Sequence, residues 1–165
     1  SIMLKVRRIE EAVRVGGTLA TEPVTVPGIA TGAAYADKDQ IGSLFEFTNV
    51  TRPGILTGTL YAGYYFDLDD EGLQVDLWLF SSQVVLAADN AAFALTDADL
   101  LQVVDVIQFT SFNDATNGQF SAVRSIGSPF RTRGGTSLYA AAQARGALNI
   151  AAANLPRFAL GVLAD

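Results

Sequence analysis

The sequence predicts an all-β protein: a jelly-roll-like β-sandwich of about eight strands, with one short helix near 97–105 and an extended N-terminal arm. Three observations lead to this prediction. Apolar and polar side chains alternate over most of the chain, the alternating runs recur at about ten-residue spacing, and glycine-rich or acidic turns separate them. The long connections at 16–40 and 81–96 favour a sandwich over an up-and-down barrel, which joins neighbouring strands by short turns.

The N-terminal 1–32 segment is predicted to form an extended arm with edge strands, ahead of a single sandwich domain over 33–165. Residues 18–40 are rich in Thr, Ala, Gly and Pro, a composition typical of an extended arm or a long loop. The tripeptide Val24-Thr25-Val26 is the one strand-like piece within them.

Three strong strand candidates follow, over 41–50, 59–68 and 73–80. In the first, Phe45 and Phe47 share one face. The second and third are joined by Asp69-Asp70-Glu71-Gly72, whose length and final glycine favour a β-hairpin loop. One face of the third strand is apolar throughout. The other face begins polar and turns apolar at Trp78, as expected where one end of a strand enters an interface.

The helix is predicted from Thr96, which can cap it, and from Asp99 three residues later, where a carboxylate favours the helix N-terminus. Further strand candidates lie at 106–112, 119–126, 137–145 and 158–162. The third of these is alanine-rich, but glycines bracket it too closely for a stable helix, and small side chains allow close sheet packing.

The composition excludes several classes of chemistry. The chain has no cysteine and no histidine, which removes thiolate nucleophiles, disulfides, the usual zinc ligands and the commonest general base. A net charge of −6 opposes binding to nucleic acid. No apolar run approaches the roughly 18 residues of a membrane helix. With 50% hydrophobic and 17% charged residues, the chain is expected to bury additional surface in an oligomer.

Two acidic features are candidate reactive sites. The cluster Asp67, Asp69, Asp70 and Glu71 has the oxygens that a hard cation needs, but it lacks calcium-loop spacing, so a solvated hairpin tip is the preferred interpretation. Glu46 and Asp76 are carboxylates on polar strand faces, and a carboxylate-dependent hydrolase would need such a pair facing a cleft. No second feature supports it. We therefore expect no enzyme activity, no catalytic residue, no metal and no cofactor.

Basic residues indicate a contact with other proteins. Residues 1–14 carry four basic and two acidic side chains, a net charge of +2, whereas the remainder carries seven basic and fifteen acidic ones, a net charge of −8. The arm is expected to dock on an acidic protein neighbour through Arg7, Arg8 and Arg14, although solvated arginines on an edge strand explain the pattern equally well. The segment 127–135 is interpreted as a flexible contact loop that presents Arg131 and Arg133.

Aromatic residues gather near the predicted hairpin: Tyr61, Tyr64, Tyr65, Phe66 and Trp78. We expect them to supply the core and a subunit interface, with Tyr64 and Trp78 as apolar contacts. The alternative is a carbohydrate-binding β-sandwich module on a tail or surface, in which exposed rings on one sheet face would stack against sugars.

Several segments resemble a known group of proteins: residues 35–42 (YADKDQIG), 73–80 (LQVDLWLF), 88–100 (ADNAAFALTDADL), 136–139 (TSLY) and 160–165 (LGVLAD). Over roughly 33–165 they resemble tailed-bacteriophage virion proteins of the kind assigned as head decoration (cement) or minor structural proteins. The resemblance implies a small β protein that sits on the outer capsid surface as a homotrimer, binds the major capsid protein and stabilises the shell. The arm before residue 33 and the segment 127–135 are not part of the resemblance.

Overall fold

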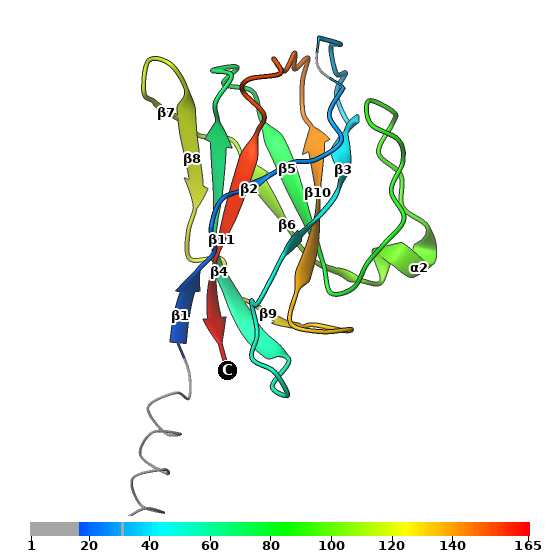
Figure 1. Ribbon diagram of the computed structural model, residues 1–165, viewed down its shortest axis with the longest axis vertical. Helices are drawn as coiled ribbons and strands as arrows, with labels where there is room; N and C mark the ends of the chain where they lie inside the picture. Colours follow the sequence, from blue (N-terminus) through cyan, green and yellow to red (C-terminus); the bar gives the residue numbers. More distant parts are fainter. Residues whose placement is uncertain (1–16, 31) are drawn as a thin grey trace, which may run out of the picture.

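The computed structural model describes residues 17–30 and 32–165, and these residues are arranged almost entirely as β-strands (Figure 1). Within them the chain forms eleven strands and a four-residue helix, so the predicted all-β fold is confirmed. The strands are β1 (Gly17–Ala20), β2 (Val24–Thr25), β3 (Gln40–Phe47), β4 (Thr57–Asp67), β5 (Val75–Phe80), β6 (Val103–Phe109), β7 (Asn113–Asp114), β8 (Gln119–Val123), β9 (Ser128–Arg131), β10 (Leu138–Ala144) and β11 (Arg157–Ala164). The helix, α2, spans Asp97–Leu100.

Two antiparallel sheets face each other in a sandwich. The seven-stranded sheet has the order β1-β11-β4-β8-β7, with β2 paired to β11 and β9 paired to β4. The four-stranded sheet has the order β3-β10-β5-β6. Its alanine-rich strand β10 lies between β3 and β5, as the strand interpretation of 137–145 requires. The two layers cover each other's apolar faces, which is why neither sheet needs a helix against its inner side.

Aromatic rings fill the space between the sheets. Tyr65 of β4 stacks on Phe158 of β11 at 4.9 Å between ring centroids, and it also contacts Phe109 of β6 at 5.8 Å. Phe158 reaches Phe45 of β3 at 6.0 Å, so the cluster joins the two sheets. All four rings are buried. Such ring pairs stabilise a core beyond the area that they bury.

A second, smaller apolar cluster lies on the outer face of the four-stranded sheet. The segment 81–102, which includes α2, covers this face (Figure 1). Phe80 and Ala141 are buried beneath it, and the ring of Trp78 lies 5.0 Å from that of Phe93. The face that turns apolar along β5 is therefore covered by the chain itself.

Two sequence-based predictions were wrong in detail. Residues 69–72 do not close a β-hairpin, because β4 belongs to the seven-stranded sheet and β5 to the four-stranded sheet. The acidic turn instead carries the chain from one layer to the other. The helix is also shorter than 97–105: it ends at Leu100, and β6 begins at Val103 because residues from there onward pair with β5.

The segment 127–135 is not entirely a loop. Residues 128–131 form β9, which pairs with the first half of β4 from Thr57 to Leu60. At the other edge of this sheet, β1 and β2 pair with β11, so the described part of the predicted arm forms edge strands. No helix in the described residues is long and apolar enough to span a membrane.

Candidate functional site: a basic end and an open aromatic face

Three arginines gather at one end of the sandwich, which we call the basic end: Arg52, Arg131 and Arg133. Arg52 lies in the connection between β3 and β4, and the other two lie at and just beyond the end of β9. The hydroxyls of Thr51 and Thr132 hold these segments together, because the two oxygens are 3.2 Å apart and both residues are buried. The contact between the two threonines thus brings the segments that carry these arginines to the same end of the sandwich.

The N-terminal segment joins the body at the same end. A Cβ on Gly17, the first described residue, would lie 3.9 Å from a guanidinium nitrogen of Arg52. Arg7, Arg8 and Arg14 lie outside the described residues. They precede Gly17 in the sequence, so the point where their segment joins the fold is beside Arg52.

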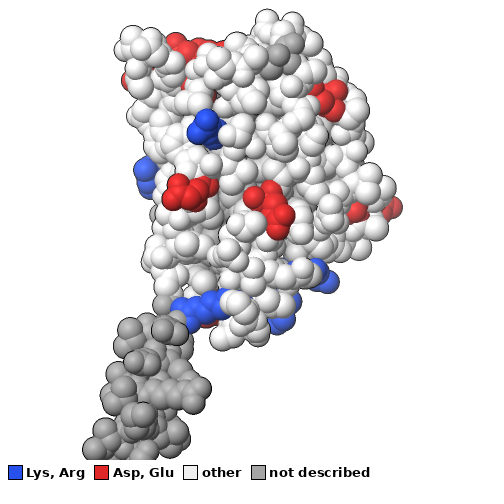
Figure 2. Space-filling model, viewed as in Figure 1, with Lys and Arg blue, Asp and Glu red and all other residues white. Residues whose placement is uncertain are grey.

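The arginines of the basic end have no acidic partner within the described part of the chain. Among the described residues, the ion pairs are those of Arg145 with Asp37 and Asp76, and none involves an arginine of the basic end. The side chains of Arg131 and Arg133 are exposed. Figure 2 shows several blue side chains at the end where β9 lies, whereas the red side chains are at the opposite rim and across the middle of this face, where further blue side chains also lie.

Carboxylates at the opposite end accept hydrogen bonds from backbone and side-chain amide groups. The Asp67 side chain accepts the Gly72 N–H at 2.7 Å, and the Asp69 side chain accepts the Asn154 amide at 3.2 Å. Burial raises the pKa of Glu71 above its ordinary value. Across 17–30 and 32–165, no group of three or more His, Cys, Asp or Glu side chains is arranged to hold a metal ion.

The outer face of the seven-stranded sheet carries a group of aromatic rings that we call the open aromatic face: Tyr61, Tyr64, Phe66 and Phe120. All four are half-buried. Tyr64 stacks on Phe120 at 6.1 Å between centroids, and the Arg124 guanidinium lies 5.8 Å from the Tyr64 ring centre. Because β8 pairs Ala122 with Tyr64, Phe120 and Arg124 flank the tyrosine from either side.

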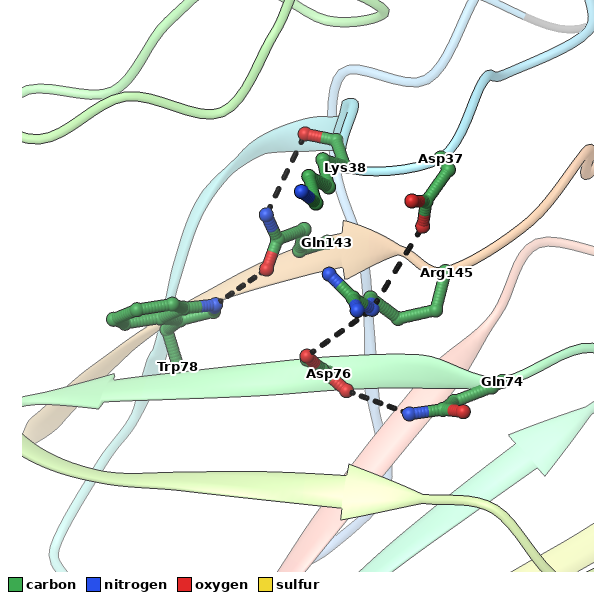
Figure 3. A network of polar contacts seen from close by, with 7 residues as sticks. All are labelled: Asp37, Lys38, Gln74, Asp76, Trp78, Gln143 and Arg145. Atoms are coloured by element: carbon green, nitrogen blue, oxygen red, sulfur yellow. Dashed lines mark hydrogen bonds and ion pairs between the residues drawn. The ribbon is translucent and has the colours of Figure 1, made fainter.

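Trp78 and Tyr64, the two predicted apolar contact residues, lie on opposite outer faces of the sandwich. Tyr64 is on the open aromatic face. Trp78 is half-buried under the 81–102 segment, where its indole N–H donates to the Gln143 side-chain oxygen at 3.0 Å (Figure 3). Tyr64 is thus the member of the pair that does not lie under the 81–102 segment.

A polar network extends from Trp78 along the same sheet. Figure 3 shows Arg145 between Asp37 and Asp76, with its Nε 3.8 Å and 3.7 Å from their carboxylate oxygens. Burial raises the pKa of Asp76, and the Gln74 hydrogen bond and the Arg145 charge offset part of that effect. These contacts tie the 37–38 turn to β5 and β10, which is a structural role.

The predicted pair of carboxylates, Glu46 and Asp76, does not form a catalytic constellation. The two residues lie on β3 and β5, on either side of β10, so about 10 Å separates their strands. Their partners on β10 are Tyr139 and Gln143, a further offset of roughly 13 Å along the strand. Glycosidase carboxylates lie about 5–10 Å apart, so this arrangement does not suit that chemistry.

Neither a protein-family model nor a curated protein matches this chain. Sequence reasoning predicted Arg131, Arg133 and Tyr64 as contact residues but did not include Arg52, which the structure brings to the same end as the two arginines. A signal for Arg52 was present in the turn Thr51-Arg52-Pro53-Gly54, which places an arginine at the tip of a chain reversal.

Proposed function

We propose that this chain is a structural virion protein that decorates a tailed-bacteriophage capsid. It binds the outer surface of the major capsid subunits as a homo-oligomer and stabilises the shell. The resemblance of 33–165 to head decoration proteins supports this class. The basic end is our candidate attachment surface, because Arg131 and Arg133 are exposed there and Gly17, which follows the basic segment 1–14, lies near Arg52 at the same end.

The observation that carries this proposal is that Arg52, Arg131 and Arg133 lie at the same end of the sandwich. These residues come from two connections far apart in the sequence, and the buried contact between Thr51 and Thr132 joins them. Arginines that form no ion pair with a described residue are suited to recognition of carboxylates on another protein. With acidic residues at the opposite rim, the basic end turns towards an acidic shell and the acidic rim turns away from it.

Homo-oligomerisation supports attachment through avidity. A trimer would present three basic ends to neighbouring capsid subunits, so that weak individual contacts combine into stable attachment. Three 17.4 kDa chains would have a mass of about 52 kDa, which light scattering coupled to size exclusion measures directly. A monomer that also stays monomeric on the shell would contradict the oligomeric part of the proposal.

The stabilising role is tested with shells from which the protein has been stripped. Adding the purified protein should raise the temperature at which these shells break open, and the arginine variant Arg133→Glu should raise it less. The control is Arg157→Glu, which makes the same charge change at an exposed position of β11. If the protein binds but leaves shell stability unchanged, the cementing role is wrong.

A further inference from the structure

An open hollow of about 490 Å³ lies on the outer side of the seven-stranded sheet, next to the edge strand β1. Its lining residues are Thr18, Tyr61, Tyr64, Arg124, Ser125 and Leu163. The volume falls in the range typical of small-ligand sites. Stable protein interfaces instead spread over roughly 800 Å² on each partner. The dimensions therefore favour a small ligand.

A β-bulge places both tyrosines on this face. Residues three apart in a regular strand point to opposite sides of a sheet. Here Ala62 pairs with Gly161 and Leu60 pairs with Val162, which leaves Tyr61 as the extra residue of β4. The bulge shifts the alternation by one residue, so Tyr61 lies on the same side as Tyr64. Bulges that re-aim a side chain in this way are common beside functional sites.

Gly161 gives the Tyr61 ring its position. A Cβ built on Gly161 would lie 2.7 Å from Cζ and 3.0 Å from the hydroxyl oxygen of Tyr61. The end of the ring therefore covers the glycine backbone and leans along the sheet instead of standing away from it. One side of the ring contacts the strand, and the other side borders the hollow. An aromatic surface of this kind stacks against the apolar face of a sugar ring.

Arg124 supplies the one formal charge in the lining. Its guanidinium is held over the Tyr64 ring, and no carboxylate in the described ranges forms an ion pair with it. The hydroxyls of Thr18 and Ser125 lie in the same lining and can bond a polyol. An aromatic platform, a fixed cation and hydroxyls together suit a ligand that has a sugar ring and a carboxylate.

We infer that this hollow binds a carboxylated saccharide, with Tyr61 against a hexuronic acid ring and Arg124 paired to its carboxylate. The hollow shares no lining residue with the basic end, but the two adjoin, because Thr18 in the lining follows Gly17, which lies near Arg52. The hollow would give the protein a second binding activity. Tyr61 forms the aromatic platform of this site. Trp78 does not contribute to it, because the 81–102 segment covers Trp78 on the other sheet.

The inference is tested by titrating the purified protein with tetragalacturonate and with its fully methyl-esterified form. The esters keep the rings and remove the charge, so the acid should bind at least about tenfold more tightly, as expected for a charge-assisted contact. Arg124→Gln should abolish this preference, and Tyr61→Leu should weaken binding of both forms. Arg157→Gln removes an exposed arginine elsewhere on β11 and should bind like the unmodified protein.

Thermal unfolding of each variant checks that the fold is retained. Equal affinity for the acid and the ester, or no binding of either by the folded protein, would overturn the inference. A second copy of the chain could occupy the hollow instead of a saccharide, and the mass of Tyr61→Leu in solution tests this alternative. If the unmodified protein is an oligomer and this variant is not, another protomer covers the hollow, and the inference is overturned. None of these results depends on whether the basic end attaches to a capsid.

Discussion

The Asp89 carboxylate accepts a hydrogen bond of 2.7 Å from the hydroxyl of Tyr35, 54 positions earlier in the sequence. The same carboxylate accepts the backbone N–H groups of Ala30 at 2.8 Å and Gly42 at 2.6 Å. Asp89 therefore ties the 81–102 cover to the chain that enters β3. Burial and the Asp89 carboxylate raise the pKa of Tyr35, which keeps its hydroxyl protonated as a donor.

Replacing Asp89 should destabilise the protein more than removing any one of its partners. Asp89→Ala leaves three donors without their acceptor, and we expect a loss of about 2–4 kcal/mol in the free energy of unfolding. Tyr35→Phe removes one hydrogen bond and should cost about 1 kcal/mol. Urea unfolding measures both. A loss below about 0.5 kcal/mol for Asp89→Ala would contradict the tethering role.

Gly42 lies where the surrounding backbone leaves no room for a side chain. Its φ is +66°, and a Cβ there would lie 2.3 Å from the Pro27 carbonyl oxygen. Gly42→Ala should therefore cost more than about 2 kcal/mol, since strain and a backbone clash combine. Gly54 is the matched control, with a φ of +81° and open space around its Cβ position. Gly54→Ala should cost about 1 kcal/mol, and equal losses in the two variants would show that the clash is relieved.

The strand pattern could be predicted from sequence because alternation reflects which side of a sheet faces the core. The runs containing Phe45 and Phe158 are examples, and both rings are buried. The crossing at 69–72 could not be predicted, since an acidic four-residue turn fits a hairpin as well as a passage between sheets. The basic end depends on contacts such as Thr51 with Thr132, which lie 81 positions apart. No local pattern encodes a contact of that kind.

The open aromatic face was only partly predictable. Tyr61 and Tyr64 are three residues apart, and regular alternation places them on opposite sides of a strand. The bulge that brings them together arises where β4 pairs with Gly161 and Val162, and these two residues are far away in the sequence. Composition thus predicted aromatic contacts near this strand, whereas their grouping on one face required the structure.

Asp76 should give the protein a distinctive dependence of stability on pH. Burial raises its pKa in the folded state above 3.8, so the folded protein holds this proton more tightly than the unfolded chain does. The resulting stabilisation is complete below pH 3.8 and is lost as the pH rises through the raised folded-state pKa. The free energy of unfolding of the unmodified protein minus that of Asp76→Asn should therefore decrease between about pH 4 and about pH 7.

The comparison variant for this prediction is Asp37→Asn, which removes the exposed carboxylate that shares Arg145. The difference in free energy of unfolding between the unmodified protein and Asp37→Asn should not decrease with rising pH in the way predicted for Asp76→Asn. An Asp76→Asn difference that stays constant or rises with pH would contradict the assignment, because it would mean that folding does not raise the pKa of this carboxyl.

Trp78, the sole tryptophan, reports on the 81–102 cover. Its ring packs 5.0 Å from that of Phe93. Phe93→Ala should shift the fluorescence of Trp78 to longer wavelength, because water reaches the indole, and should cost about 2–4 kcal/mol of stability. Fluorescence and urea unfolding measure the two effects. An unchanged emission maximum would show that Phe93 does not shield the indole from solvent.

Removal of residues 1–15 should weaken capsid attachment and leave the sandwich folded. The deleted segment carries the basic arm residues, whereas the strands that pair with β11 begin at Gly17. Circular dichroism should show an unchanged melting temperature, and co-sedimentation with shells should show reduced binding. Undiminished binding by the folded deletion variant would remove the arm from the attachment surface.

The central claim is that the basic end attaches the protein to an acidic capsid surface. The most direct test is the affinity of Arg131→Glu and Arg133→Glu for shells that lack the protein, measured at low and at physiological salt beside Arg157→Glu. The account predicts that each of the first two variants loses at least about tenfold in affinity, that Arg157→Glu binds like the unmodified protein, and that salt weakens the native contact. Equal binding by all four proteins, with no dependence on salt, would contradict it.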